Sequence, residues 1–433
     1  MKTLKNIVVV CDYGHVEGGA ARIALDTAKV LARDGYRVWL FCAVGPVDGE
    51  LAAAGVQTVC LGQDDILHEK SRVRGVLRGL CNRQAKRAFS ELLSSLDPEE
   101  TVIHAHTWTK GVSSVIFPVA EKKHFRVVLT VHDFFLVCPN GGLFNYRTSR
   151  ICTYKPLSLR CLLCNCDSRS YPQKLFRVWR QGVQNRNIRR RKNVSYIFIS
   201  EFAKREFLRR YDRIPEDQRY FLTNMIRFDA VRSRVPCEQN ETYLYIGGVA
   251  EHKGLRVFCE AVTAAGVPAT VVGTGILEAE LKQKYPNICF AGWKSKAEML
   301  PYMQEARCLI FPSIWYEASP LTPLEAMAHG VPVICSDLNA ASENVRDGQT
   351  GYLYAGAGGS RALAEAIGKT QDDEVIRRMS EYIFEHFDAE RYSEATYLRG
   401  LLQIYKKVLY GEEAEKTDHS VVCPVSTVGA EKP

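Results

Sequence analysis

The chain of 433 residues exceeds the roughly 250 to 300 residues at which a single hydrophobic core stops growing, so two domains are expected. Hydrophobic residues make up 46% and charged residues 24%, which is typical of globular proteins, and no apolar run is long enough to cross a bilayer. The formal net charge of +8 is too small to indicate a nucleic-acid-binding protein, so nucleic acid is not an expected partner.

Short apolar runs alternate with helical patterns from the start of the chain. In the first half these runs are 7–10, 38–41, 102–104, 127–131 and 196–199, and in the second half they are 242–246, 269–272, 288–291, 308–311 and 331–335. Strands that are separated by helices predict parallel sheets with helices on both faces. The sequence therefore predicts an α/β protein with two Rossmann-like, doubly wound domains.

The domain boundaries follow from composition. The segment after 226 is polar, contains Pro236 and lacks periodicity, as expected of a linker. The end of the chain is also polar and unpatterned, which is typical of disorder. We expect a first domain over 1–226 with a cysteine-rich insertion at 138–172, a linker over 227–241, a second domain over 242–385, a helix over 386–410 that returns to the first domain, and a disordered tail over 411–433.

Fifteen cysteines occur in a chain whose first residues lead directly into an apolar strand instead of a signal-peptide pattern. Without an export signal, such cysteines are expected in a reducing compartment, as packing residues, metal ligands or nucleophiles and not as disulfides. The sequence therefore predicts a cytoplasmic protein.

Glycine-rich segments follow the first strand of each predicted domain. Gly18 and Gly19 open a helix, and Gly248 lies in the loop that leads to Lys253. In an open parallel sheet, ligands bind beyond the carboxyl ends of the strands, where helix amides favour an anion. Each segment alone is as readily a structural turn, or a solvated lysine on a loop, as a phosphate site.

Histidines stand at two neighbouring strand ends. His106 follows the strand at 102–104, and His132 with Asp133 follows the strand at 127–131. A histidine here can bond a sugar hydroxyl or share in proton transfer, although a single one could equally be a packing residue. Two of them after neighbouring strands favour a polar site.

Two glutamates flank the start of a predicted helix after the strand at 308–311. Glu317 lies in the loop and Glu325 lies in the helix, while the segment from Ser319 to Thr322 places backbone amides at the helix start. This arrangement offers one carboxylate to a sugar, a row of donors to phosphate, and a second carboxylate to a ribose diol.

The segment from Glu317 to Glu325, with the following Ala-Met-Ala-x-Gly-x-Pro-Val-Ile, resembles the E-x7-E signature of family-4 retaining glycosyltransferases with the GT-B fold. Supporting segments occur in the order of that family over residues 1–410. They are Gly18-Gly19, His132, Lys253-Gly254, Gly273-Thr274-Gly275, and Glu343 followed by Gly348-x-Thr350-Gly351-x-Leu353. The resemblance implies two Rossmann-like domains that face a central cleft.

The resemblance also implies residue roles. Glu317 would contact the transferred sugar, Glu325 the donor ribose and Lys253 the leaving diphosphate, while His132 would approach the sugar from the opposing domain. Relatives often carry arginine in place of Gly248, so this chain lacks a second cation on the phosphate side. A second departure is the segment at 318–320, where many relatives have a loop that contains glycine.

These implications give one assignment of the site. The expected catalytic residues are His132 and Glu317, and the expected acceptor-side residues are His106 and Asp133. The expected donor-binding residues are Gly18, Gly19, Gly248, Lys253, Ser319, Leu321, Thr322 and Glu325.

The predicted activity is transfer of a hexose-type sugar from a nucleotide sugar to a glycan or lipid-linked acceptor, in bacterial surface polysaccharide synthesis. No Asp-x-Asp pair follows a strand, so donor binding requires no metal cofactor. Two routes to retention stay open, one with an oxocarbenium-like transition state stabilised by charge and one with a covalent intermediate on Glu317. The alternatives are a non-catalytic nucleotide-sugar-binding subunit, a sugar-nucleotide epimerase of the same fold, and a phosphorylase-like enzyme.

Five cysteines lie in the insertion after the fourth strand, and one pair has the Cys-x-x-Cys spacing of zinc ligands. Two interpretations stay open, a structural zinc site and a group of reduced thiols that order the loop. The candidate ligands are Cys138, Cys152, Cys161, Cys164 and Cys166.

Basic residues are concentrated at 70–87 and 174–192 in the first half. Apolar residues over 73–92 have helical spacing, which predicts a basic amphipathic helix. Such a helix could lie on the anionic inner face of a membrane, or it could be a sheet-packing helix whose arginines are solvated. The first interpretation predicts a peripheral protein that meets a lipid-linked acceptor.

Overall fold

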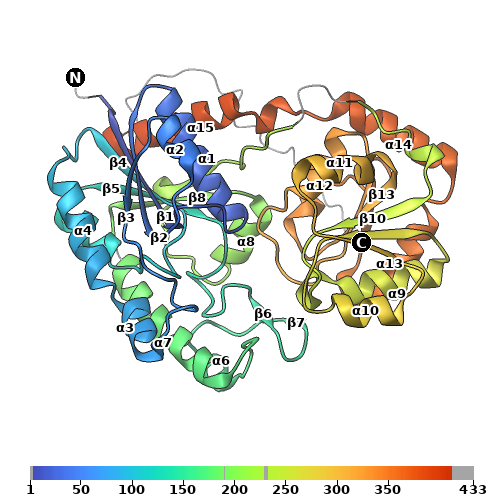
Figure 1. The fold of residues 1–433 in the computed structure, drawn as a ribbon, viewed down its shortest axis with the longest axis horizontal. Helices are drawn as coiled ribbons and strands as arrows, with labels where there is room; N and C mark the ends of the chain where they lie inside the picture. The colour runs from blue at the N-terminus through green and yellow to red at the C-terminus, as the bar shows by residue number, and fades with distance from the viewer. Residues whose placement is uncertain (1–2, 190, 229–232, 412–433) are drawn as a thin grey trace, which may run out of the picture.

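The computed structural model describes residues 3–189, 191–228 and 233–411. Within them, two parallel sheets flanked by helices form two lobes that lie side by side (Figure 1). This arrangement confirms the predicted α/β fold class. The expected tail over 411–433 lies outside the described residues except for Gly411.

The first sheet has seven strands in the order β3-β2-β1-β4-β5-β8-β9, and every adjacent pair is parallel. The inner strands β1 and β4 are buried along their whole length, as expected of parallel strands covered on both faces. The strands are β1 (Asn6–Tyr13), β2 (Arg37–Val44), β3 (Gln57–Cys60), β4 (Thr101–Ala105), β5 (Arg126–Val131), β8 (Val194–Phe198) and β9 (Arg219–Phe221).

The second sheet has six parallel strands in the order β12-β11-β10-β13-β14-β15. They are β10 (Thr242–Ile246), β11 (Ala269–Val272), β12 (Cys289–Gly292), β13 (Ala306–Phe311), β14 (Val333–Ser336) and β15 (Gly351–Tyr354). All ten apolar runs of the sequence are strands. The sequence patterns did not reveal β3, β9 and β15, which are short and only partly buried.

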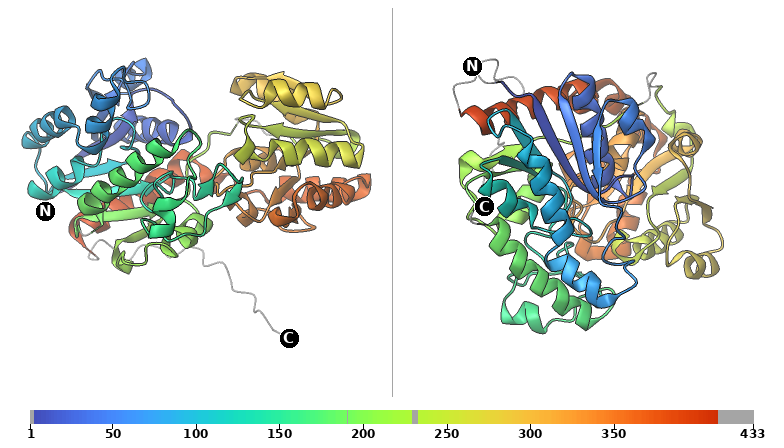
Figure 2. Two further views of the ribbon diagram at one scale, coloured as in Figure 1. Left: turned by 90° about the horizontal axis from the view of Figure 1, so that it is seen from below. Right: turned by 60° about the vertical axis from the view of Figure 1, so that its left-hand side comes forward.

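Helices cover both faces of each sheet (Figure 2). In the first lobe they are α1 (Gly19–Arg33), α2 (Gly49–Ala53), α3 (Arg72–Leu80), α4 (Arg83–Ser94), α5 (Ile116–Lys122), α6 (Leu159–Leu163), α7 (Tyr171–Ile188) and α8 (Glu201–Leu208). In the second lobe they are α9 (Leu255–Ala265), α10 (Glu278–Lys284), α11 (Lys296–Gln304), α12 (Thr322–Ala328), α13 (Gly359–Gly368) and α14 (Asp373–His386).

The single amphipathic helix predicted over 73–92 is wrong, because the structure divides this segment into α3 and α4. The side chain of Asn82 accepts a hydrogen bond from the backbone N–H of Ala85 and begins α4 there. Leu80 and Phe89 are buried as predicted, but Val73 and Leu77 are exposed, at 68% and 60%. The outer face of α3 is therefore apolar as well as basic.

The cysteine-rich insertion forms a two-stranded antiparallel hairpin and a short helix. The hairpin pairs β6 (Phe144–Asn145) with β7 (Arg150–Ile151), and α6 follows before α7 returns the chain to the first sheet. This insertion begins in the loop after β5, so it lies beside the carboxyl ends of the first sheet.

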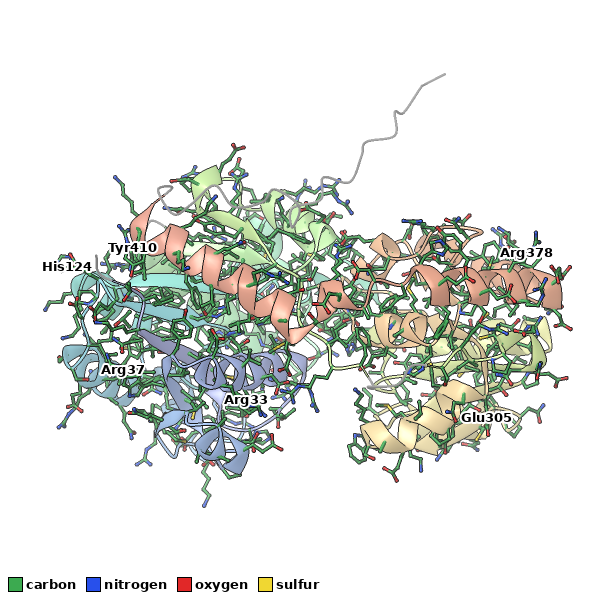
Figure 3. All side chains as sticks on the ribbon, turned by 90° about the horizontal axis from the view of Figure 1, so that it is seen from above. Arg33, Arg37, His124, Glu305, Arg378 and Tyr410 are labelled. Atoms are coloured by element: carbon green, nitrogen blue, oxygen red, sulfur yellow. The ribbon has the colours of Figure 1, made fainter. Side chains whose placement is uncertain are left out.

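The last helix, α15 (Glu394–Tyr410), packs against the first sheet although it follows the second in sequence. The Tyr405 hydroxyl lies 2.7 Å from Nδ1 of the buried His104, and the Tyr397 hydroxyl lies 2.9 Å from that of Thr27. Figure 3 shows Tyr410 at the far end of α15, over the first lobe, whereas Arg378 of α14 lies on the second. The chain thus crosses between the lobes twice.

No helix in the described part of the chain combines the length and the apolar character needed to span a bilayer.

Candidate functional site

The residues singled out by the sequence stand at the carboxyl ends of strands in both sheets. His106 follows β4 and His132 follows β5, while Lys253 follows β10 and Glu317 follows β13. The strand ends of the two lobes meet where the loop that carries Glu317 contacts the first lobe.

Lys253 and Glu317 form the central ion pair of the second lobe. Lys253 Nζ lies 2.6 Å from Glu317 Oε1, and the Lys253 and Glu317 side chains are 28% and 14% exposed. The same oxygen accepts hydrogen bonds from Trp315 Nε1 at 2.6 Å and from the Ser313 hydroxyl at 3.0 Å. Lys253, which was expected to contact the diphosphate, and Glu317, which was expected to contact the sugar, are therefore in direct contact with each other.

Glu317 is held as a carboxylate by these contacts. Burial alone would raise its pKa, but the charge and hydrogen bond of Lys253, together with the bonds from Trp315 and Ser313, hold the pKa below its usual value. Glu317 is therefore ionised at neutral pH, and a ligand phosphate that recruits Lys253 would remove its counter-ion.

Backbone geometry fixes Lys253 in place. Lys253 ends a 3₁₀ turn and Gly254 follows it with φ of 77°, in the left-handed region that glycine favours. A Cβ atom at Gly254 would lie 2.0 Å from the carbonyl oxygen of Pro312, so no other residue fits without a backbone shift. Gly248 is different, since a Cβ atom there would meet no atom within 4 Å. The missing arginine at this position is thus not excluded by packing.

The second glutamate lies on the helix that follows this loop. Helix α12 begins at Thr322 with Leu321 as its N-cap, and no side chain caps it. Glu325 is partly exposed in the first turn, and Ser319 lies in the preceding loop. The amides at this helix start point away from the helix body, as required of donors to a phosphate.

The loop between β13 and α12 also contacts the first lobe. Tyr316 packs edge-on against Phe134 and Phe202, at ring-centroid distances of 6.1 and 5.2 Å. The Ser200 hydroxyl donates to the Ala318 carbonyl oxygen at 2.5 Å, and Glu343 accepts from the backbone N–H of Phe202. Glu317 therefore sits between two residues that are anchored on the opposite lobe.

The cysteine-rich insertion closes the other side of the ion pair. Tyr146 of the insertion lies edge-on to His252, at 5.7 Å between ring centroids, and His252 in turn packs on Trp315 at 4.4 Å. A Cβ atom at Gly142 would lie 3.0 Å from the Trp315 ring. The Lys253–Glu317 pair is thus covered by aromatic rings from both lobes.

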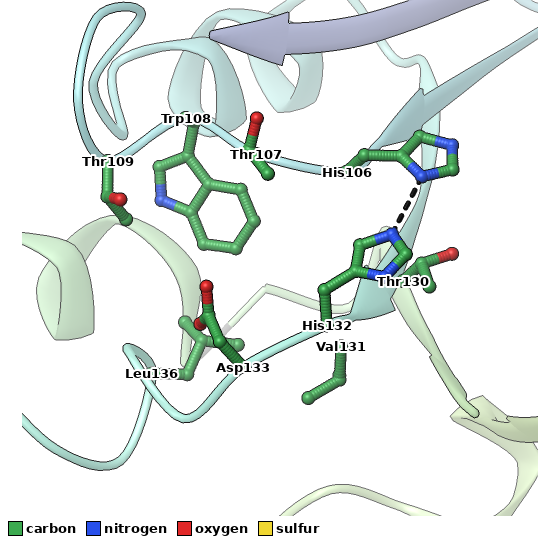
Figure 4. A pocket seen from close by; sticks show the side chains of 9 residues that line it. All are labelled: His106, Thr107, Trp108, Thr109, Thr130, Val131, His132, Asp133 and Leu136. Atoms are coloured by element: carbon green, nitrogen blue, oxygen red, sulfur yellow. Dashed lines mark hydrogen bonds between the residues drawn. The ribbon is translucent and has the colours of Figure 1, made fainter. Parts of the chain in front are cut away.

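Three histidines form a row at the strand ends of the first lobe, in which His104 and His106 are buried and His132 is partly exposed. His106 Nδ1 lies 2.9 Å from His132 Nε2, a contact drawn as a dashed line in Figure 4, and the centroids of the His104 and His106 rings lie 4.1 Å apart. Burial lowers the pKa of His132 to about 4 and that of His104 to about 3, and it also lowers the pKa of His106. All three are therefore neutral at physiological pH.

His106 and His132 differ in their exposure to solvent. His106 is only 2% exposed and its contact is with His132, whereas His132 is partly exposed at the strand end. The space between them and Trp108 and Asp133 has a volume of about 10 Å³ (Figure 4), which is room for a water molecule and not for a sugar. Burial raises the pKa of Asp133 to about 6.

Gly18 and Gly19 are exposed at the start of α1, and Gly18 has φ of 130°. A Cβ atom at either glycine would meet no atom within 4 Å. The backbone of this turn is therefore open to solvent, and its role in donor binding stays a prediction.

The cysteines of the insertion gather around the amine of Lys174, which is 1% exposed. Lys174 Nζ lies 3.1 Å from Cys166 Sγ and 3.6 Å from Cys161 Sγ. Burial opposes its charge, but the hydrogen bond to Cys166 and the surrounding sulfurs raise the pKa of Lys174. In the described residues no group of three or more His, Cys, Asp or Glu side chains is placed to hold a metal ion.

Sequence reasoning missed the residues that hold Glu317 and enclose it. Ser313 and Trp315 precede Glu317 by four and two residues, and His252 precedes Lys253 directly. Because these three residues lie in the same strand-end loops as Glu317 and Lys253, the sequence could have indicated them. No sequence signal placed Tyr146 there, because the insertion that carries it lies far away in the chain.

Comparisons with known proteins agree with this geometry. A family model described as "Glycosyltransferase Family 4" matches residues 17–226, and one described as "Glycosyl transferases group 1" matches residues 240–373. Together the two models cover both lobes.

Curated relatives match part of the chain. A phosphatidyl-myo-inositol mannosyltransferase of Mycobacterium leprae is 30% identical over 178 residues, which are 39% of this chain and 47% of that protein. O-antigen chain mannosyltransferase C of Escherichia coli is 25% identical over 138 residues, which are 30% of this chain and 37% of that protein. The chain thus matches about half or less of the length of these relatives.

Solved structures share the fold over nearly the whole chain. The sucrose-phosphate synthase of Thermosynechococcus elongatus superposes with a TM-score of 0.69 at 18% identity, covering 94% of this chain and 100% of that one. Anabaena HepE in complex with UDP and glucose superposes with a TM-score of 0.63 at 16% identity, covering 93% and 99%. These similarities confirm the predicted architecture of two Rossmann-like domains.

Proposed function

This chain belongs to the family-4 glycosyltransferases of group 1, and from that premise we propose that it is a retaining hexosyltransferase. Its donor is a nucleotide sugar, and its acceptor is a glycan or a lipid-linked glycan of bacterial surface polysaccharide synthesis. The observation that carries the proposal is the Lys253–Glu317 pair at the start of the helix that bears Glu325. Relatives named for O-antigen and amylovoran synthesis support the choice of acceptor class.

Donor binding rearranges the ion pair in this mechanism. The diphosphate lies beside Lys253 and the amides at the start of α12, and Glu325 bonds the ribose hydroxyls. Lys253 then leaves Glu317 and binds phosphate oxygens. This contact stabilises the leaving diphosphate as the bond between the sugar and the diphosphate breaks. The released Glu317 carboxylate faces the sugar and stabilises positive charge that develops on it.

His132 completes the site from the opposite lobe. Because its imidazole is neutral, it can accept or donate a hydrogen bond to a sugar hydroxyl without adding a charge. Its bond to the buried His106 fixes the ring orientation. His106 is therefore a positioning residue, and Asp133 is the adjacent carboxylate on the acceptor side.

A donor screen followed by product analysis tests the proposal. We expect one nucleotide sugar among UDP, GDP, ADP and CMP derivatives to raise the melting temperature, because a ligand that binds the native state stabilises it. With that donor, NMR of the product should show the anomeric configuration of the donor. Binding without turnover would favour the non-catalytic subunit, and conversion of the donor without an acceptor would favour the epimerase.

The zinc interpretation of the insertion remains a proposal beside the thiol interpretation. Lys174 Nζ contacts the sulfurs of Cys161 and Cys166, and a bound Zn²⁺ would have to displace the amine from Cys166. Metal analysis of the purified protein separates the two interpretations, and neither enters the donor mechanism.

We also propose that the protein binds an anionic membrane on its cytoplasmic face. Helices α3, α6 and α7 lie together at one end of the first lobe (Figures 1 and 2), and their outer surface is here called the α3–α6–α7 face. It exposes large apolar side chains beside the exposed Arg72 and Arg74. These are Val73, Leu77, Leu159, Leu163, Leu175 and Trp179.

The basic run at 186–192 includes two arginines that make structural contacts and are not simply solvated. Arg189 stacks on the Tyr211 ring at 4.4 Å and donates to the Leu136 carbonyl oxygen, and Arg191 pairs with Glu121. Arg190 lies outside the described residues. Neutralising this whole run would remove structural contacts, so it does not test membrane binding.

The α3–α6–α7 face gives a cleaner test. We expect the protein to sediment with vesicles that contain anionic lipid at low salt and to be released as salt rises, because each basic residue contributes on the order of 1 kcal/mol at such a surface. Arg72→Gln with Arg74→Gln should weaken binding about tenfold or more, and Trp179→Ala should weaken it at all salt concentrations. The control is Lys406→Gln with Lys407→Gln on α15, an equal charge change elsewhere. Equal losses of vesicle binding in the two double variants would overturn the assignment of this face.

A further inference from the structure

A large basic pocket lies in the first lobe at the end of α7. Its volume is about 600 Å³, and it is bounded by the last turn of α7, the segment that follows α8 and the insertion. Cationic side chains from all three segments line it, namely Lys155, Arg186, Arg189, Arg210 and Arg213, against one carboxylate, that of Asp212.

Most of this positive charge is unneutralised. In the described residues no carboxylate lies within ion-pairing distance of Lys155, Arg186 or Arg213, whereas Arg210 pairs with Glu206 at 3.0 Å. The pocket also has polar atoms that are buried without a hydrogen-bond partner in the described chain, Arg189 Nε and Asn185 Oδ1. A bound anion would neutralise the clustered cations and accept a hydrogen bond from the unused guanidinium N–H.

Two contacts connect the pocket to the proposed catalytic site. Arg189 donates to the Leu136 carbonyl oxygen at 2.7 Å, in the loop that begins with His132. The Arg210 guanidinium lies 5.8 Å from the centre of the Tyr316 ring, and Tyr316 directly precedes Glu317. A group bound in the pocket would thus lie one side chain away from the loops that carry both proposed catalytic residues.

The exposed face of α7 leads to the same pocket. Its most exposed residues recur every three or four positions, from Leu175 and Trp179 through Gly182 to Arg186. This spacing places them in one stripe along the helix. The apolar part of the stripe belongs to the α3–α6–α7 face, and its last residue lines the pocket. An amphiphile lying on this face would carry its charged head towards the arginines.

We propose that this basic pocket binds the phosphate or diphosphate group of the acceptor, which is thereby a phosphate-bearing glycan carrier and not a neutral glycan. The inference rests on the proposed glycosyl transfer, since it names the acceptor class of that reaction. Arginine forks recognise phosphate oxygens in pairs, and several of them around one pocket match the charge of a diphosphate. The donor diphosphate is assigned to Lys253 in the other lobe, so the pocket is a second anion site.

Inorganic pyrophosphate tests the pocket in isolation. Calorimetric titration is carried out on Lys253→Ala, so that the donor site does not contribute, and on the same protein with Arg186→Gln and Arg213→Gln added. Both arginines are exposed and unpaired in the described chain, so the fold should persist, which circular dichroism and the melting temperature verify. The charge-matched control adds Lys406→Gln and Lys407→Gln instead.

We expect Arg186→Gln with Arg213→Gln, the pocket pair, to weaken pyrophosphate binding about tenfold or more. The control pair, Lys406→Gln with Lys407→Gln, should change it by less than about twofold. Absence of pyrophosphate binding, or equal weakening by both pairs, would overturn the proposal. Nucleotide-sugar binding by the protein with intact Lys253 should be unchanged by the pocket pair. If the unsubstituted protein bound no nucleotide sugar, the proposed function would be overturned, whereas the pyrophosphate result would still stand.

A second arm identifies the source of the phosphate. Sedimentation is measured with phosphatidylcholine vesicles that contain a prenyl diphosphate, with and without free pyrophosphate as competitor. Binding that needs Arg186 and Arg213 and is displaced by pyrophosphate supports a lipid-borne diphosphate. Binding of free pyrophosphate alone supports a soluble phosphate-bearing acceptor. Vesicle binding that is indifferent to both arginines and to pyrophosphate would place the lipid contact elsewhere and overturn the lipid source.

Discussion

Replacing Lys253 by alanine should lower kcat/KM by about two to three orders of magnitude, the largest loss that we expect from one cation. Lys253 is the partner of Glu317 at 2.6 Å and the cation assigned to the leaving diphosphate. Gly248 supplies no second cation where relatives often have arginine. The loss should therefore exceed that in relatives that retain the arginine. Steady-state kinetics measure it, with Lys282→Ala, an exposed lysine of the same lobe, as the control.

A rescue experiment makes this prediction sharper. Because a Cβ atom at Gly248 would meet no atom within 4 Å, Gly248→Arg can be accommodated. When it is added to Lys253→Ala, Gly248→Arg should raise kcat/KM about tenfold, because it returns a cation to the phosphate side. A loss of less than about threefold in Lys253→Ala itself would show that the amides at the start of α12 carry the diphosphate charge.

Replacing the two glutamates should separate turnover from donor affinity. Glu317→Gln keeps the shape of the side chain but removes the charge, and we expect kcat to fall by about two to three orders of magnitude with little change in donor affinity. Glu317→Ala should show the same kinetic loss. Glu325→Ala should mainly weaken donor binding, because it removes contacts that exist in both the ground and transition states.

Calorimetry of donor binding beside single-turnover kinetics measures both effects. Glu317→Ala also leaves Lys253, Trp315 and Ser313 without their shared acceptor, so its melting temperature should fall more than that of Glu317→Gln. If both glutamate variants bound donor and turned over like the unsubstituted protein, the assignment of the E-x7-E segment would be wrong.

Local patterns were enough to predict the long buried strands and the candidate loops. The central strands, such as β1 and β13, are continuous apolar runs because a parallel strand is covered on both faces, and their ends mark where ligand-binding loops begin. Lys253, Glu317 and His132 could be singled out for this reason. Short edge strands such as β9 carry no such signal, because they are only partly buried.

The α3–α4 segment shows where periodicity misled. Apolar residues at helical spacing continue across Cys81 and Asn82, so the pattern did not reveal the break that the Asn82 cap produces. The exposure of Val73 and Leu77 depends on what packs against α3, and that partner is α7, about a hundred residues later.

The sequence by itself determined the two Rossmann-like domains and the residues at their strand ends, because burial on both faces and strand-end loops are local properties of the chain. Only the tertiary structure decided which of those residues meet. The Lys253–Glu317 pair, the edge-on contact of Tyr146 with His252, the row of histidines tied to Tyr405, and the basic pocket all join segments distant in sequence. Such contacts follow from how loops and helices pack across the two sheets, and no spacing within one segment encodes them.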